Sequence, residues 1–400
     1  MLRKIQASEL QVGMHLHELC GSWMDHPFWR SRFTLTDPTD IRRILESGIT
    51  EVRIDTIKGL DVPAKRTVEK PADPAPDKTP RVEAPKSVPR MEELKRAAMV
   101  CKKAKQAVVS MFQEVRMGNA ISAESAGELV DEISSSVIRN PGALISLARL
   151  KTADDYTYMH SVAVCALMVA LARQLGLGEK ETREAGMAGL LHDLGKAVMP
   201  IKVLNKPGKL TDDEFRIIKS HPVEGHRLLT ESKKVSDIVL DVCLHHHEKI
   251  DGSGYPDKLT GDQISLYAKM GAVCDVYDAI TSNRPYKTGW DPAESIRRMT
   301  GWSRKGHFDD LVFQAFIKSI GIYPVGSLVR LSSGRLAVVT EQSEKSLLAP
   351  QVKVFFSITS QMRIVPELID LARAGSIEKI VSREDPNSWG ITDLDVLWVN

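Results

Sequence analysis

The sequence predicts a mainly helical protein, with a small α+β domain before the helices and a small β-rich region after them. Three features of the chain support this prediction. Apolar residues recur at helical spacing through most of residues 150–320. Residues 62–90 contain seven prolines among charged residues and alanines, which is typical of an extended linker with little to bury. Residues 324–400 change to the two-residue period of β-strands.

These changes in composition predict five parts along the chain. The first part is expected to regulate the others, and the third to connect them. The parts are residues 1–61, a small α+β N-terminal domain; 62–90, a Pro-rich linker; 91–142, a helical connector; 143–323, the main helical domain; and 324–400, a β-rich C-terminal region.

Local signals predict individual elements. Asp37 and Pro38 form a helix start and Gly48 a helix stop, so a helix is expected at 38–47, followed by a strand at 51–55. The runs VGSLVRL and RLAVVTE, separated by SSG, predict a hairpin, and VKVFF a further strand. The N-terminal aromatic residues are expected in a small core, with a ligand platform as the alternative. These residues are Trp23, Phe28 and Trp29.

A long helix is expected at residues 91–117, with further helices at 123–138 and 143–150. One side of the long helix is apolar and the other is rich in lysine. Packing in the core is the first interpretation, and a dimer-forming or signal-transmitting helix is the second. The apolar residues are Leu94, Ala98, Cys101, Ala104, Val108, Met111 and Val115.

Composition argues against several classes of function. The net charge is +2 and no long basic block is present, so neither a general nucleic-acid nor a membrane-surface role is expected. Five cysteines form no CxxC pair, which indicates a reduced protein. The apolar run Val162 to Ala172 is too short to cross a bilayer, and the first ten residues lack a signal-peptide pattern. A cytoplasmic location is therefore predicted.

Histidines and aspartates gather in the main helical domain. Six of the eleven histidines fall at positions 192, 221, 226, 245, 246 and 247, and His160 lies 32 residues before the first of them. Asp275 and Asp278 are three residues apart and share one face of a helix. Each histidine alone is more often a core or surface residue than a ligand. Together, however, imidazoles and carboxylates from separate helices are what a cluster of two or more transition-metal ions needs.

The adjacent residues His192 and Asp193 suit such a cluster. Neighbours on a helix diverge by about 100°, so the imidazole can hold one ion while the two carboxylate oxygens bridge to a second. In two-metal hydrolases the ions lie about 3.5–4 Å apart and activate a shared water. Spacing and composition therefore predict a metal-dependent hydrolase.

Several motifs then occur in one order along the chain: MHS around His160, HDLGKA, SHP, HHEKIDGSGYP, DVYDA and NRPYK. In this order they resemble the HD-GYP domain, a branch of the HD superfamily of metal-dependent phosphohydrolases. The resemblance covers about residues 143–325 and implies an HD-type helical bundle. The first sixty residues resemble a domain of unknown function that is often found ahead of HD-GYP domains.

The resemblance implies a role in bacterial second-messenger signalling: hydrolysis of cyclic di-GMP to linear pGpG or, on further cleavage, to GMP, by attack of a metal-bridging hydroxide on phosphorus. Asp193 is the expected bridge, and Lys196 would offset charge in the transition state. Arg284 and Lys287 would hold phosphates, with a solvated loop as their alternative role. Tyr255 would brace the loop, or else face a guanine. The implied metal ligands are His160, His192, Asp193, His221, His246, His247 and Asp275.

One position departs from the family pattern. Some HD-GYP enzymes carry a glutamate four residues before the first histidine, where it can serve a third ion, but this chain has Tyr156 there. Two divalent transition-metal ions are therefore predicted, which puts the second cleavage in doubt. Iron or manganese is the family expectation, and zinc, cobalt and nickel are compatible with the same ligands.

Several assignments stay open. Asp278 is either an acceptor for a ligand histidine or a structural cap, Glu248 either orients a ligand or forms a surface ion pair, and His226 and His245 are expected not to bind metal. A module that binds cyclic di-GMP or a partner with little turnover is the alternative function, and hydrolysis of another nucleotide is a third. Expected partners are cyclic di-GMP, a second copy of the chain, and a diguanylate cyclase or other signalling proteins, but not DNA, RNA or a membrane.

Overall fold

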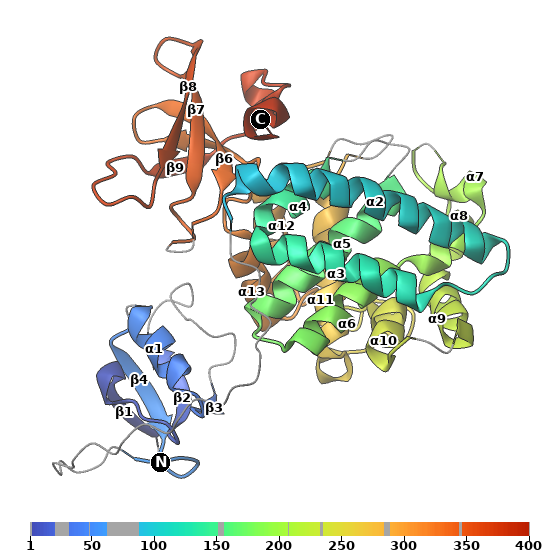
Figure 1. The fold of residues 1–400 in the computed structure, drawn as a ribbon, viewed down its shortest axis with the longest axis horizontal. Helices are drawn as coiled ribbons and strands as arrows, with labels where there is room; N and C mark the ends of the chain where they lie inside the picture. Colours follow the sequence, from blue (N-terminus) through green and yellow to red (C-terminus); the bar gives the residue numbers. More distant parts are fainter. Residues whose placement is uncertain are drawn as a thin grey trace. The chain divides into compact units, whose positions relative to one another are not determined.

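The computed structural model describes residues 2–20, 32–47, 49–61, 88–150, 156–206, 208–232, 235–283, 289–343 and 346–399. The chain divides into two compact units, Met1–Ala84 and Pro85–Asn400 (Figure 1). Three aromatic residues of the first unit for which a core position is predicted lie outside the described residues. They are Trp23, Phe28 and Trp29.

The first unit is a four-stranded antiparallel sheet with one α-helix, in the strand order β1-β4-β2-β3. The Asp37 side chain accepts a hydrogen bond from the backbone N–H of Thr39 and so caps the start of the helix. The predicted helix and strand are both confirmed. The elements are β1 (Leu2–Gln6), β2 (His15–Cys20), β3 (Phe33–Thr34), α1 (Pro38–Glu46) and β4 (Glu51–Asp55).

The second unit is built around α5 (Tyr156–Gln174), whose apolar run is almost wholly buried. This run is a core helix, and no helix in the described part of the chain is long and apolar enough to cross a membrane. The surrounding helices are α2 (Arg90–Arg116), α3 (Ala123–Arg139), α4 (Pro141–Arg149), α6 (Glu179–Leu191), α7 (Ile201–Leu204), α8 (Asp212–Ile218), α9 (His221–Ser232), α10 (Asp237–His245), α11 (Leu266–Thr281), α12 (Pro292–Ser303) and α13 (Asp310–Ile320).

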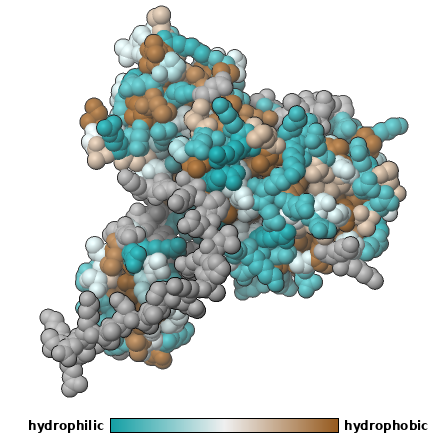
Figure 2. Space-filling view, in the orientation of Figure 1, coloured by the Kyte–Doolittle hydropathy of each residue, from teal (hydrophilic) through white to brown (hydrophobic). Residues whose placement is uncertain are grey.

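Helix α2 packs along the bundle against α3, α4 and α5, as the core interpretation predicts. The prediction for one residue of the apolar side of this helix is wrong: Ala98 is exposed, and Ala97 is buried in its place. The buried side runs from Leu94 to Cys101 in steps of three and four residues, and these steps pass through Ala97. Hydrophilic side chains cover much of the displayed face over α2 and α3 (Figure 2).

The C-terminal region is a five-stranded antiparallel sheet in the order β8-β7-β6-β5-β9. The predicted hairpin is β5–β6, with Leu328 opposite Val338 and Gly334 in the left-handed region at φ +73°. Arg90, buried at the start of α2, donates to the Trp398 carbonyl at 2.6 Å and ties the sheet region to the helices. The elements are β5 (Leu328–Leu331), β6 (Arg335–Glu341), β7 (Gln351–Ser357), β8 (Met362–Asp370), β9 (Ile380–Arg383) and α14 (Leu394–Val399).

Candidate metal centre

Five segments of the helical bundle bring seven histidine and aspartate side chains together. His160 lies in α5, Asp275 in α11 and His221 at the first position of α9. The pair His192–Asp193 follows α6, and His246 and His247 follow α10. All are buried except His247, whose side chain is 21% exposed. The structure therefore brings together all seven residues that the motifs single out as metal ligands.

Two glycines allow this close approach. Gly195, in the short 3₁₀ turn after Asp193, lies so near α9 that an added Cβ would be 1.9 Å from the His221 carbonyl oxygen. Gly225, one turn further along α9, lies on the other side of the same contact. A side chain at position 195 would push His221 away from Asp193, and a Cβ at position 225 would lie 2.7 Å from Cys243 Sγ and 3.0 Å from the Gly195 backbone nitrogen. The glycines of HDLGK and HPVEG were the signal for this contact in the sequence.

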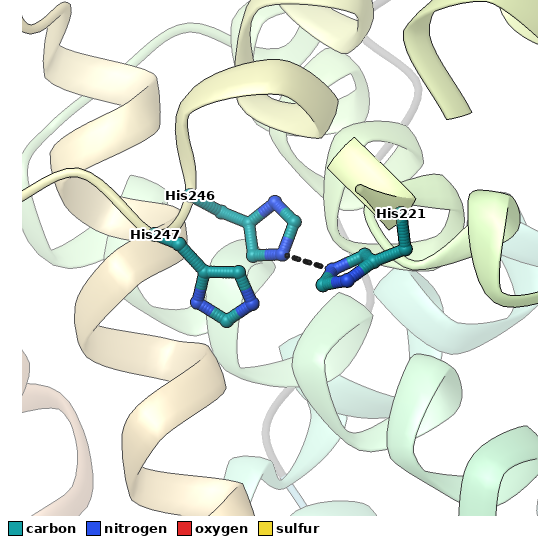
Figure 3. Close-up of side chains that lie close together, drawn as sticks. All are labelled: His221, His246 and His247. Carbon is teal, nitrogen blue, oxygen red and sulfur yellow. Dashed lines mark hydrogen bonds between the residues drawn. The ribbon is translucent and has the colours of Figure 1, made fainter. Parts of the chain in front are cut away.

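The ligand atoms form three groups of three. Two of them share no residue, and the third, His192, Asp193 and His246, contains one member of each of these two. His160, His192 and Asp275 form one group, and in each group the atoms lie within 4.8 Å of one another. His221, His246 and His247 form the second group, and Figure 3 shows their rings turned toward one another. We call these the first and the second trio.

The Asp193 carboxylate lies between the trios. Its Oδ2 is 3.4 Å from His160 Nε2 and 3.5 Å from His192 Nε2, in the first trio. Its Oδ1 is 3.1 Å from His221 Nε2 and 3.8 Å from His246 Nε2, in the second. One oxygen therefore faces each trio, which is the arrangement that a carboxylate bridging two ions requires.

The ring nitrogens of four histidines are oriented for metal binding. Each Nδ1 contacts an oxygen that can accept its proton, and this leaves the Nε2 lone pair to bind a metal ion at the centre. Outer contacts of this kind are typical of metal-bound histidines. The Nδ1–oxygen distances are 2.8 Å from His192 to the Gly189 carbonyl, 2.7 Å from His221 to that of Ile218, 3.0 Å from His246 to that of Cys243, and 2.6 Å from His160 to Asp278 Oδ2.

The centre lacks the hydrogen bonds that would satisfy it without a cation. His192 Nε2 and Asp193 Oδ1 are buried and have no hydrogen-bond partner among the described residues. The Nε2 atoms of His221 and His246 are 3.2 Å apart (Figure 3), although both rings donate from Nδ1. Two facing lone pairs repel unless a positive charge lies between them. The residues therefore fit metal ions, and mixed imidazole and carboxylate ligands suit iron, manganese, zinc or cobalt.

Burial and neighbouring charges set protonation states that suit metal binding. Burial lowers the pKa of His246 well below its ordinary value and that of His247 to about 3, so both rings are neutral near pH 7. Burial alone would raise the pKa of Asp193. The nearby Lys196 and His192 outweigh it, and the Asp193 pKa falls well below the ordinary value, which keeps the carboxylate charged.

The loop after His247 is folded around one buried carboxylate. Glu248 is 2% exposed, and its carboxylate accepts backbone N–H bonds from Asp257 at 2.7 Å, Lys258 at 2.9 Å and Leu259 at 3.1 Å. A Cβ on Gly254 would lie 2.5 Å from Glu248 Cα, so only glycine fits there. Glu248 thus organises the loop, and its contacts differ from both roles considered from the sequence.

Tyr255 belongs to this loop and stacks on His247, with ring centroids 4.7 Å apart and planes inclined by 29°. The contact favours bracing over the alternative of facing a guanine.

Lys196 forms an ion pair with the central carboxylate: its Nζ is 2.5 Å from Asp193 Oδ2.

The remaining residues considered from the sequence are also placed, with two exceptions. His245 faces away and contacts Asp241 and Asp257. His226 belongs to none of the ligand groups found among the described residues. Arg284 and Lys287, proposed to bind phosphate, lie outside the described residues.

Comparisons with known proteins give the family. The chain matches the model of the HD domain over residues 138–312 and that of a domain of unknown function, DUF3391, over residues 2–126. An HD-domain protein is therefore the class that fold and match define. A solved structure, Bd1817, a HDG"Y"P protein from Bdellovibrio bacteriovorus, aligns with a TM-score of 0.47 and 17% identity over 80% of this chain and 99% of that one.

The curated relatives narrow the class. Cyclic di-GMP phosphodiesterase PA4108 of Pseudomonas aeruginosa is 56% identical over 399 residues, which cover 100% of this chain and 96% of that protein. The response regulator RpfG of Xanthomonas campestris, also named a cyclic di-GMP phosphodiesterase, is 45% identical over 36% of this chain and 40% of its own. The 3'3'-cGAMP-specific phosphodiesterase 1 of Vibrio cholerae is 34% identical over 42% of this chain and 38% of its own. The chain belongs to the HD-GYP family of phosphodiesterases, as its motifs predict.

Proposed function

We propose that this protein hydrolyses cyclic di-GMP to linear pGpG with two divalent metal ions. The observation that carries the proposal is the Asp193 carboxylate, which presents one oxygen to each of two histidine-rich trios. The relative from P. aeruginosa, which is named for this activity and matches along the whole chain, supports the choice of substrate.

Each residue has a defined part in this proposal. One ion would be held by His160, His192 and Asp275, the other by His221, His246 and His247, and Asp193 would bind both. When bound, such a metal pair activates water and neutralises charge on the phosphate. Iron or manganese is proposed, as the family resemblance suggests.

Lys196 supplies a fixed positive charge beside Asp193. This charge would stabilise the negative charge that develops on phosphorus during attack. A cytoplasmic location, a homodimer and contacts with a diguanylate cyclase or other signalling proteins remain predictions.

The activity is tested with purified protein reconstituted under anaerobic conditions with Fe(II) or with Mn(II). Wild-type protein is expected to cleave cyclic di-GMP, while the double variant His192→Ala and Asp193→Ala loses turnover. Binding without cleavage by the wild type would favour the alternative, a signalling module. Faster cleavage of 3'3'-cGAMP would point to the other substrate that is named among the relatives.

Metal number and product are tested in the same preparation. We expect two ions per chain and accumulation of pGpG, with GMP formed slowly, because Tyr156 stands where the family pattern of some HD-GYP enzymes has a glutamate. Helix α5 begins at Tyr156, but its side chain lies outside the described residues. Elemental analysis beside product chromatography measures both quantities. Three tightly bound ions per chain would contradict the proposal.

Asp278 is expected to tune metal affinity through His160. Its Oδ2 lies 2.6 Å from His160 Nδ1, so it fixes the ring with Nε2 toward the first trio. The substitution Asp278→Asn should weaken metal affinity about 10- to 100-fold, as is typical for residues behind metal-bound histidines. Titration of metal-free protein against a chelator measures this affinity. Asp262→Asn, at an exposed position, is the control, and equal affinities in the two variants would show that Asp278 is only structural.

A further inference from the structure

Lys219, at the end of α8, lies beside the metal centre without a carboxylate partner among the described residues. Its Nζ lies 4.7 Å from the centroid of the Tyr255 ring and 5.0 Å from that of Phe215. Two other lysines in this part of the chain are paired with carboxylates, Lys196 with Asp193 and Lys206 with Glu214. Lys219 therefore differs from them in having aromatic rings as its neighbours.

The two rings can hold an ammonium group in place without occupying its donors. Cation–π attraction acts between the charge and the ring face, whereas each N–H of the ammonium group still needs an acceptor. Lys219 is half-buried, so its position is more restricted than that of an ordinary surface lysine. Phe215 is 48% exposed, so the ring on the outer side of this arrangement is open to solvent.

Lys219 is close to the reacting centre through one intervening ring. Tyr255 stacks on His247 of the second trio, and Lys219 lies over the same Tyr255 ring. In addition, Lys219 is two residues before His221, another member of that trio. An anion bound by Lys219 would thus lie beside the metal centre but outside it.

We propose that Lys219 binds the phosphate of the substrate that is not cleaved. This inference rests on the proposed function, because a cyclic dinucleotide carries two phosphodiesters. When one of them lies at the trios, the other keeps a full negative charge, which a cation beside the centre can offset in addition to the phosphate-binding role expected of Arg284 and Lys287 from the sequence. Lys196 already pairs with Asp193, whereas Lys219 presents a point charge of the kind that binds phosphate. Phe215 and Tyr255 position the ammonium group.

The test compares a substrate that has two phosphates with one that has a single phosphate. In Lys219→Met, KM for cyclic di-GMP should rise about 10- to 100-fold, the loss expected for a hydrogen bond between charged groups, with kcat within about threefold. With bis(p-nitrophenyl) phosphate, which has no second phosphate, kcat/KM should stay within about twofold. Lys219→Arg should restore part of the affinity for cyclic di-GMP.

The matched control is Lys180→Met, which removes an exposed lysine roughly 18 Å from His192 along α6. It should change neither KM nor kcat for either substrate. Equal losses of kcat/KM with both substrates would show that Lys219 only supports Tyr255, and an unchanged KM for cyclic di-GMP would show that Lys219 binds no phosphate. Either result overturns this inference but leaves the proposed function in place. A wild-type protein that does not cleave cyclic di-GMP overturns the proposed function, and the inference with it.

Discussion

Replacing Asp193 with asparagine is expected to lower kcat for cyclic di-GMP by about a thousandfold or more and to reduce the metal content below one ion per chain. The Asp193 carboxylate contacts two histidines of each trio, with one oxygen facing each side, so its loss affects both trios. Asparagine has nearly the same shape but only one acceptor oxygen, and its NH₂ group would point at one of the trios. It also removes the ion pair with Lys196.

The measurements are turnover of cyclic di-GMP and elemental analysis after reconstitution with Mn(II). Asp262→Asn controls for the loss of one negative charge, since Asp262 is exposed, and it should behave like the wild type. A second control, His245→Ala, removes a histidine next to the second trio that faces Asp241 and Asp257 instead. If Asp193→Asn keeps two ions and more than about a tenth of the wild-type kcat, Asp193 does not bridge them.

The sequence could predict which residues meet at the centre because they lie in short motifs with fixed spacing. The sequence could not predict which aspartate contacts which ring nitrogen of a ligand histidine. Asp275 and Asp278 lie on one helical face, and only the direction of the His160 ring shows that Asp275 lies near Nε2 and Asp278 near Nδ1. Lys219 was missed because its neighbours are two rings, one of which comes from a distant loop. The four-residue spacing of Phe215, in α8, and Lys219, which directly follows α8, was the local signal.

The fold, too, has parts that local sequence predicts and parts that it does not. Periodicity and capping residues predict α1, β4 and the β5–β6 hairpin, because these depend on neighbours in the sequence. The order of strands in each sheet and the junction of α2 with the C-terminal region depend on pairing between distant segments. Arg90, for example, donates its backbone N–H to Glu341 and its guanidinium to the Trp398 carbonyl, about 250 and 300 residues away. A lone arginine that ends a Pro-rich linker gives no sign of these partners.

Removing the Glu248 carboxylate is expected to damage both stability and catalysis. Three consecutive backbone N–H groups, from Asp257 to Leu259, donate to this one buried side chain. Glu248→Ala leaves them without an acceptor, which should lower the free energy of unfolding by about 3 kcal/mol. The loop also carries Tyr255, which stacks on His247, so kcat/KM for cyclic di-GMP should fall about 10- to 100-fold as the second trio loosens.

Denaturant unfolding measures the stability, and hydrogen exchange over residues 251–260 reports the loop directly. Exchange at Asp257, Lys258 and Leu259 should become faster in Glu248→Ala, while amides within α5 should keep their protection when corrected for the global change. In Glu248→Gln, the stability and the exchange of these loop amides should lie between those of the wild type and those of Glu248→Ala. The single side-chain oxygen of glutamine can still accept two of the three hydrogen bonds. Glu179→Ala, at the exposed start of α6, is the matched control and should change stability by no more than about 0.5 kcal/mol. Normal exchange in the loop of Glu248→Ala, together with normal turnover, would mean that the loop holds its shape and Tyr255 its stacking without this carboxylate.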